Sequence, residues 1–191
     1  MNDTHKIIHN LSTDRLILRE WRDSDLPSLY QMVSDPDVME FFPSVLSEIE
    51  AQGFLKAIQD KMHQYGWGMW ACELKSTQEV IGFVGLNIPQ DDFDFNPCVE
   101  IGWRLRKEFW HQGLAQEAAR EVLKFGFTEL NLDKIVAFTT VTNIPSQALM
   151  QRLNMIKNEK HFNHPRLAED HPLAEHVLYE LTKDSWLASQ N

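Results

Sequence analysis

Three strand-like patterns follow one another between residues 67 and 106, and no helical pattern separates them. They cover Trp67–Leu74, Val80–Ile88 and Cys98–Arg106, and a turn at Ser76–Glu79 predicts that the first two form a hairpin. A doubly wound nucleotide-binding fold places a helix after each strand, so three adjacent strands argue against that fold.

Helical and strand patterns on both sides of this run complete the expected fold. Ser47 and Glu50 match a capping box at a helix start, and either Asp23 or Ser24 is expected to cap the preceding helix. Together the elements predict an α/β fold with a mixed sheet. In chain order the remaining predictions are a strand at Arg15–Trp21, helices at Leu26–Val33 and Glu48–Tyr65, a helix at Gly113–Leu130, a strand at Ile135–Thr140, a helix at Pro145–Leu153, and strands at Met155–His161 and His176–Leu181.

Two apolar patterns predict which of these elements pack in the core. The strand at Ile135–Thr140 is almost uninterruptedly apolar and rich in β-branched residues, which is typical of the interior of a sheet. The helix at Glu48–Tyr65 is expected to bury one stripe of side chains, namely Ile49, Phe54, Leu55, Ile58 and Met62.

The composition is that of a folded domain with an apolar core. The chain has 191 residues, of which 43% are apolar, and it contains no repeat, low-complexity tract or flexible linker. Residues 1–191 are therefore expected to form a single domain. No stretch approaches the roughly 20 apolar residues of a membrane span, and residues 1–10 lack a signal or transit pattern. A cytoplasmic protein that does not bind membranes is expected.

The charge balance limits the classes of partner. The chain carries 18 Lys and Arg against 28 Asp and Glu, a net charge of −10, which disfavours non-specific nucleic-acid binding and mildly favours a cationic substrate through electrostatic steering. Arg104, Arg106 and Lys107 nevertheless fall together, with His111 close behind. This cluster predicts local binding of an anion, although a solvated strand end explains it equally well.

The segment after the third strand has the features of a phosphate site. Gln112, Gly113, Leu114 and Ala115 open a helix, and a helix start offers unpaired N–H groups with partial positive charge. Small residues there let a phosphate approach the backbone. The sequence has neither a P-loop pattern nor a Gly-x-Gly-x-x-Gly pattern.

Four segments, in this order and spacing, resemble one known family. They are Thr13–Arg19, Glu79–Leu86, Trp110–Ala115 and Asn143–Leu149. The sequence resembles the GNAT superfamily of acetyl-CoA-dependent N-acetyltransferases, and more narrowly the Rim-type branch of ribosomal-protein N-terminal acetyltransferases. The resemblance covers nearly the whole chain and implies a GNAT-like mixed, mostly antiparallel central sheet flanked by helices.

The sequence departs from the family pattern at several positions. Trp110 replaces Arg or Gln, and His111 replaces a frequent Gly, so a positive φ at His111 would be strained. Asn154 replaces the Gly that ends the second motif, and Asn still tolerates a left-handed conformation. Met150 occupies the place where many relatives carry a Tyr proton donor.

The resemblance implies which residues bind acetyl-CoA, the cosubstrate. The backbone N–H groups of Gly113, Leu114 and Ala115 are expected to hold the pyrophosphate, with Gln112 nearby. The strand is expected to bond the pantetheine arm through its backbone and to polarise the thioester carbonyl. The implied cofactor-binding residues are Ile101, Trp103, Leu105, Arg106, Lys107, Gln112, Gly113, Leu114, Ala115, Asn143 and Ser146.

Two residues are candidates for proton transfer to and from the reacting groups. Glu100 shares a strand face with Gly102 and is the expected general base for the amine; a surface carboxylate is the alternative. Ser146 is expected to protonate or hydrogen-bond the departing thiolate, unless it serves to cap a helix near Asn143. Asn143 itself is expected to contact the pantetheine arm or to tie the two motifs together.

Other reactive or aromatic residues have ordinary structural explanations. Cys72 is expected in the core, and neither cysteine lies in the motif, so no covalent acyl-enzyme is expected. His161, His164, His171 and His176 lack a fixed ligand spacing, so no metal is expected. The segment Phe41–Pro43 together with Trp67 is expected either to line the acceptor pocket or to serve in packing.

The sequence leaves three functional hypotheses. The first is an acetyltransferase that moves an acetyl group from acetyl-CoA directly to a primary amine, either a protein N-terminus or a small amine, in a ternary complex. The second is a non-catalytic acyl-CoA-binding or sensory domain of the same fold, which the absent Tyr keeps open. The third is a structural interaction domain without a ligand. The acceptor's identity and a homodimer are left open.

Overall fold

The computed structural model describes residues 6–190, and these residues divide into two compact units. The first unit comprises the chain up to Leu86 together with Gly102–Val122. The second comprises Asn87–Ile101 and the chain from Leu123 onward. Strand β5 (Glu100–Leu105) and helix α3 (Leu114–Thr128) each run from one unit into the other.

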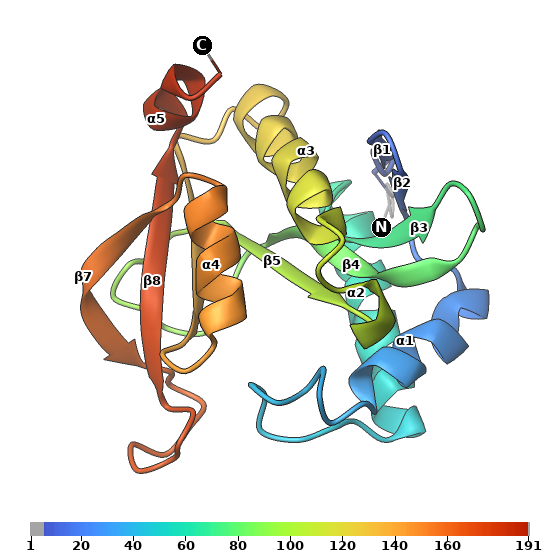
Figure 1. Cartoon of the computed structure of the whole chain (residues 1–191), viewed down its shortest axis with the longest axis horizontal. Helices are drawn as coiled ribbons and strands as arrows, with labels where there is room; N and C mark the ends of the chain where they lie inside the picture. Colours follow the sequence, from blue (N-terminus) through green and yellow to red (C-terminus); the bar gives the residue numbers. More distant parts are fainter. Residues whose placement is uncertain (1–5, 191) are drawn as a thin grey trace, which may run out of the picture. The chain divides into compact units, whose positions relative to one another are not determined.

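The first unit consists of antiparallel strands and two packed helices. Strand β2 pairs with β1 on one side and β3 on the other, and β3 pairs with β4 as the predicted hairpin. Helix α1 packs on α2, as the blue and cyan helices of Figure 1 show. The elements are β1 (Leu11–Ser12), β2 (Leu16–Arg19), α1 (Leu26–Val33), α2 (Glu48–Tyr65), β3 (Met69–Leu74) and β4 (Val80–Asn87), whose last residue lies in the second unit.

Close backbone approach explains a glycine at the centre of this sheet. Gly82 has φ 145°, and a Cβ there would lie 2.2 Å from the carbonyl oxygen of Arg104 on β5. No side chain fits that space, so β4 meets β5 only because Gly82 has none. The arrangement fixes the position of the β5 backbone beside Gly82.

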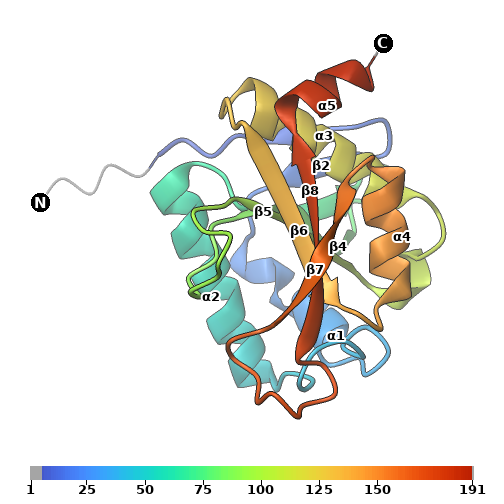
Figure 2. The same ribbon diagram turned by 90° about the vertical axis from the view of Figure 1, so that its left-hand side faces the viewer.

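The second unit is built around β6 (Lys134–Thr140). This strand pairs along its full length with β8 (Glu175–Thr182) and in parallel with β5 through Glu100 and Val136. Its residues Ile135, Val136 and Ala137 are buried, which confirms the predicted interior strand. Figure 2 shows the other elements of this unit, β7 (Ile156–Asn163) beside β8 and helix α4 (Ile144–Arg152) alongside them. A short helix α5 (Lys183–Ala188) follows β8.

All strand pairings together give the order β1-β2-β3-β4-β5-β6-β8-β7. This is an open, mostly antiparallel sheet with helices in the connections, which confirms the predicted fold class. Among residues 6–190, no helix combines the length and apolar character that crossing a bilayer requires.

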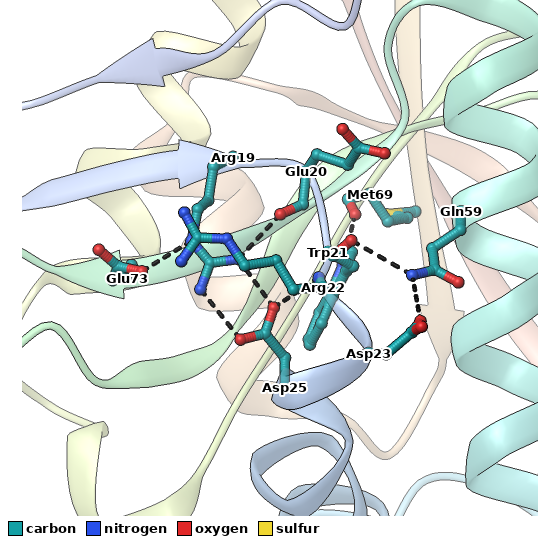
Figure 3. Close-up of polar contacts among 9 residues, drawn as sticks. All are labelled: Arg19, Glu20, Trp21, Arg22, Asp23, Asp25, Gln59, Met69 and Glu73. Carbon is teal, nitrogen blue, oxygen red and sulfur yellow. Dashed lines mark hydrogen bonds and ion pairs between the residues drawn. The ribbon is translucent and has the colours of Figure 1, made fainter. Parts of the chain in front are cut away.

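Three details of the predicted elements were wrong. Neither Asp23 nor Ser24 caps α1, because both lie in a 3₁₀ turn (Asp23–Asp25) before the helix. The carboxylate of Asp25, the residue just before α1, accepts hydrogen bonds from the Arg19 guanidinium and the Arg22 N–H, as Figure 3 shows. Ile49 is 82% exposed and does not belong to the buried stripe of α2. Helix α5 and the two-residue strand β1 were not predicted, since both are too short to show a hydrophobic period.

Candidate active site

The loop between β5 and α3 presents its backbone to solvent. A 3₁₀ turn (Lys107–Phe109) leads from β5 into the loop, where His111, Gln112 and Gly113 are exposed. Both His111 (φ 58°) and Gly113 (φ 75°) adopt left-handed conformations, which confirms the strain predicted at His111. The Gly113 carbonyl accepts the first helical bond, from the Glu117 N–H. The N–H groups between them have no acceptor within the helix and can bind an anion.

Arg15 supports this loop, and sequence reasoning gave it no role. Its guanidinium donates to the Gln112 carbonyl oxygen (2.9 Å) and, through Nε, to the Glu117 carboxylate (2.6 Å). Another guanidinium nitrogen, Nη2, lies 3.6 Å from where a Cβ on Gly113 would be. Arg15 therefore holds a positive charge beside the helix start. Its only sequence signal was its place in the first family-like segment.

Glu117 fixes Arg15 in turn. Its carboxylate also accepts from the Thr13 hydroxyl (2.5 Å) and the Arg15 N–H (2.8 Å). Burial alone would raise the pKa of Glu117, but these hydrogen bonds and the guanidinium outweigh it and hold the pKa below its usual value. Glu117 is therefore ionised at neutral pH, and the Arg15 guanidinium keeps its orientation.

The other predicted phosphate ligands have protein partners in this structure. Arg106 is 8% exposed and pairs with Glu79 (2.6 Å) and with Glu108. Lys107 pairs with Asp37, and this contact raises the pKa of Lys107. The Gln112 side chain donates to the Glu108 carbonyl oxygen (2.9 Å). The predicted phosphate contacts of Arg106 and Lys107 therefore require both to exchange partners.

The two faces of β5 differ as predicted. Ile101 and Leu105 are buried, and Trp103 is half-buried. The opposite face carries Glu100, Gly102 and Arg104 by strand alternation. At Gly102 an added Cβ would lie 3.0 Å from the end of the flexible Met69 side chain. This position therefore has little spare room.

Glu100 is anchored at the first position of β5. Its backbone pairs with Val136 on β6, and its carboxylate accepts a long hydrogen bond from the Asn87 amide (3.4 Å). The side chain is half-buried. A carboxylate held in this way can accept a proton from a substrate amine directly or through a water molecule.

Asn143 and Ser146 meet at the start of α4. The Asn143 side-chain oxygen accepts from the Ser146 N–H (3.1 Å), and its amide donates to the Thr139 hydroxyl (2.9 Å). Asn143 therefore caps α4 and ties it to β6, so the Ser146 hydroxyl is not needed as the cap. Met150, on the same helix, is buried.

Neither cysteine has the properties of a nucleophile. Cys72 is completely buried, which confirms its predicted core position, and burial raises the pKa of its thiol to about 12. Partial burial and the negative charge of Glu100 raise the pKa of the Cys98 thiol to about 11. Thiolate, the reactive form, is therefore scarce at both positions at neutral pH.

The histidines and the loop aromatics have packing partners. His164 and His176 lie 5.1 Å apart, ring to ring, within a cluster that also contains Phe93, Phe138 and Phe162. Within residues 6–190, no three His, Cys, Asp or Glu side chains are grouped to hold a metal ion. Trp67 packs against Tyr65 with the two rings tilted, and Phe42 lies against the Arg104 guanidinium.

Comparison with known proteins identifies the family. Residues 15–156 match the family model of the acetyltransferase (GNAT) domain. The chain belongs to the GNAT acetyltransferase family. This confirms the family predicted from the sequence motifs, and the matched range includes the loop at Gly113, Glu100 and the start of α4.

Relatives and solved GNAT structures agree with this assignment. The uncharacterized N-acetyltransferase p20 of Bacillus licheniformis is 32% identical over 152 residues, which cover 78% of this chain and 84% of that protein. A GNAT-family acetyltransferase from Bacillus anthracis has a TM-score of 0.76 at 22% identity, covering 92% of this chain and 99% of that one. The ribosomal L7/L12 α-N-protein acetyltransferase RimL, in complex with coenzyme A, has a TM-score of 0.73 at 19% identity, covering 93% and 99%.

The family assignment also gives the type of reaction. GNAT enzymes take their acetyl group from acetyl-CoA, and this chain is an acetyl-CoA-dependent acetyltransferase. The two structural neighbours, both below 25% identity, establish only the shared fold.

Proposed function

We propose that this chain transfers the acetyl group of acetyl-CoA directly to a primary amine, a protein N-terminus or a small amine, in a ternary complex. The start of α3 carries the proposal. There, exposed Gly113 with positive φ precedes N–H groups that have no helical acceptor, and the Arg15 guanidinium lies beside it. A diphosphate carries the charge and acceptor oxygens that such a site binds best.

The residues around the loop fit the cosubstrate. Backbone N–H groups at Gly113, Leu114 and Ala115 would hold the diphosphate, and Arg15 joins Gln112 as a neighbour of this site. The β5 backbone at Ile101, Trp103 and Leu105 would bond the pantetheine arm, with Asn143 as a further contact. Arg106 and Lys107 would bind phosphate oxygens of the coenzyme after leaving their present carboxylate partners.

We assign the proton transfers to two side chains. Acetyl-CoA supplies the acetyl group as a reactive thioester. A protonated acceptor amine first loses one proton to solvent, because only the neutral amine can attack. Glu100 takes the second proton from the acceptor nitrogen as the new C–N bond forms and the C–S bond breaks, and releases it to solvent afterwards. A backbone N–H of β5 stabilises negative charge on the carbonyl oxygen, an effect worth about 2.7–4 kcal/mol for a single donor. Ser146 donates a proton to the departing sulfur, because Met150 has none to give, and recovers it from solvent.

We further propose that the two compact units work as one catalytic domain. The matching family model runs from residue 15 to residue 156 and so includes parts of both units. The proposed diphosphate ligands belong to the first unit, and Glu100 and Ser146 belong to the second.

Titration calorimetry with acetyl-CoA and with free CoA tests the proposal. Ala115→Asp places a negative charge among the N–H groups of α3, where it favours the helix but repels phosphate. We expect this variant to bind both coenzymes at least tenfold more weakly than the wild type while its melting temperature stays within a few degrees. Ala57→Asp, the same change at an exposed position of α2, is the matched control and should bind normally.

Turnover completes the test. Free thiol released from acetyl-CoA in the presence of a panel of primary amines measures acetyl transfer. Folded wild-type protein that gives no binding heat with either coenzyme, or that binds but releases no thiol with any amine, contradicts the proposal. Normal coenzyme binding by Ala115→Asp would contradict the assignment of the diphosphate to the start of α3.

A further inference from the structure

Arg104 on β5 is an arginine without a counter-charge. Its Nε atom is buried and has no hydrogen-bond partner, and no ion pair or hydrogen bond of its guanidinium is found among residues 6–190. Burial lowers the pKa of Arg104 to about 10, with no carboxylate to oppose the effect, so the group is still charged at neutral pH. The Arg104 side chain as a whole is half-buried. A charge that is partly removed from water and has no counter-charge is costly for a folded protein.

The two buried arginines of the same unit, Arg19 and Arg106, are neutralised by carboxylates. Arg19 donates two hydrogen bonds to Asp25 (2.7 and 3.0 Å) and one to Glu73 (2.7 Å), as Figure 3 shows. Arg106 pairs with Glu79 and Glu108. Each of these guanidinium groups thus has two carboxylates, whereas Arg104 has none. The Nε atom of Arg106 is also buried without a hydrogen-bond partner in the described part of the chain, but its other guanidinium nitrogens are paired with carboxylates. What distinguishes Arg104 from Arg19 and Arg106 is therefore the lack of a carboxylate partner among residues 6–190.

Within the described residues, two aromatic rings, and no carboxylate, lie next to the Arg104 guanidinium. The guanidinium carbon of Arg104 lies 3.7 Å from the ring centre of Phe42 and 5.4 Å from that of Phe83. Such cation–π contacts contribute roughly 0.5–2 kcal/mol each. A ring below or above the guanidinium, however, accepts no hydrogen bond from the N–H groups, which point outward in the guanidinium plane. Those in-plane donors match the two oxygens of a carboxylate.

Arg104 lies on the face of β5 where the acceptor amine is proposed to react. Strand alternation places Arg104 and Gly102 on the face of β5 that also carries Glu100, the proposed base. Phe42 lies in the connection between α1 and α2 and is 39% exposed, so one wall of the Arg104 site reaches solvent. The proposed diphosphate site, by contrast, follows the far end of β5, beyond Leu105.

We infer that Arg104 determines acceptor specificity by binding a carboxylate of the acceptor, which is therefore an amine that also carries a carboxylate. The inference rests on the proposed acetyl transfer and narrows its substrate class. The carboxylate would come either from a free amino acid or from an acidic side chain near a peptide N-terminus. The net charge of −10 favours a cationic substrate at long range. At contact distance the attraction between the unpaired guanidinium and a carboxylate is stronger than this long-range effect.

Acetylation of matched amine pairs tests the inference. One pair is a free amino acid and its amide, and the other is a short peptide with Glu or with Gln after the N-terminal residue. We expect the wild-type kcat/KM to be 10- to 100-fold higher for the carboxylate member of one pair, as a charged hydrogen-bond partner predicts. The pair that shows the preference identifies the source of the carboxylate.

Variants at Arg104 separate specificity from structure. Arg104→Met should remove the preference by raising KM for the carboxylate substrate, with kcat and coenzyme affinity nearly unchanged. Arg104→Lys should keep part of the preference. Arg120→Met, which removes an exposed arginine of α3, is the control and should keep all of it.

Three results would overturn the inference. These are equal wild-type rates for both members of each pair, an equal loss on carboxylate and neutral amines in Arg104→Met, or a loss of coenzyme binding in that variant, which would assign Arg104 to a coenzyme phosphate. The wild-type comparison decides the matter even if Arg104→Met does not fold. Turnover of neutral amines without any preference contradicts this inference alone, whereas absent coenzyme binding contradicts the proposed function.

Discussion

At the scale of single residues, the proposed chemistry depends on the Glu100 carboxylate. Most primary amines are protonated at neutral pH, and a protonated amine cannot attack a thioester. Glu100 sits at the first position of β5, held by Val136 through the backbone and by Asn87 through its side chain. Once the amine is neutral and attacks, a carboxylate fixed in this way can take the proton that the nitrogen loses without first being reoriented.

We expect Glu100→Gln to lower kcat at pH 7 by roughly 10²- to 10⁴-fold, because it removes the proton acceptor and keeps the side-chain shape. The acetyl-CoA dissociation constant should change little, since the proposed coenzyme contacts are elsewhere. A pH–rate profile and calorimetry measure the two effects. Glu159→Gln, at an exposed position of β7, is the control. An unchanged pH–rate profile in Glu100→Gln would remove Glu100 from the mechanism.

Residues whose role is set by distant partners were hard to predict from the sequence. The spacing of the motifs was sufficient to single out Gly113, Ala115 and Asn143, and strand alternation singled out Glu100 on the face of Gly102. The proposed roles of Arg15 and Arg104 depend on their neighbours in the fold. Arg15 is held by Glu117, and Arg104 lies against Phe42. Such contacts join segments far apart in the chain, and no local pattern of residues encodes them.

At the scale of helices and strands, long periodic segments were predicted well. The expected bounds Leu26–Val33 and Glu48–Tyr65 are those of α1 and α2. The predicted caps of α1, Asp23 or Ser24, failed because both lie in the 3₁₀ turn before the helix, so the N-cap position falls to Asp25. The Asp25 carboxylate accepts hydrogen bonds from buried Arg19 and none from the N–H groups of α1. Tertiary charge pairing thus overrode a local preference.

The β3–β4 turn gives a prediction at this scale. Gln78 has φ 59°, a left-handed backbone conformation that is strained for residues other than Gly and Asn. Gln78→Gly should therefore raise the free energy of unfolding by up to about 1 kcal/mol. Gln52→Gly, at an exposed position within α2, should lower it by about 1 kcal/mol, because Gly weakens a helix.

Urea denaturation of both variants measures these opposite effects. The pair is matched, because the same side chain is removed from two exposed backbones of different conformation. Destabilisation of Gln78→Gly by as much as Gln52→Gly would show that the Gln78 side chain stabilises the turn by more than its backbone strain costs.

At the scale of the whole molecule, net charge and local charge have separate consequences. The chain is acidic overall, with a net charge of −10, yet Arg15 lies beside the α3 start and Arg104 has no carboxylate partner within residues 6–190. Net charge acts over about one Debye length, about 8 Å at physiological salt, and governs approach. The local cations act on contact. An anionic coenzyme and an acidic protein are therefore compatible.

The stability of the whole molecule should also depend on two histidines of the second unit. Burial lowers the pKa of both His164 and His176 below the ordinary value of 6.5. In His176 the hydrogen bond to the Ala174 carbonyl opposes this shift and the nearby His164 adds to it. For His164, Asp91 opposes the shift and Arg166 reinforces it. The unfolded chain therefore binds protons at a higher pH than the folded one.

Stability should accordingly be complete above about pH 6.5 and should fall as the pH drops through that value toward the folded pKa. Urea denaturation between pH 7.5 and 5.5 measures the slope, in a range where carboxylates remain ionised. The double variant His164→Gln/His176→Gln should lose part of it, while His171→Gln, a half-buried histidine of the same unit, should keep it. If the double variant retained the full slope, the pH dependence would have to come from groups outside this aromatic cluster.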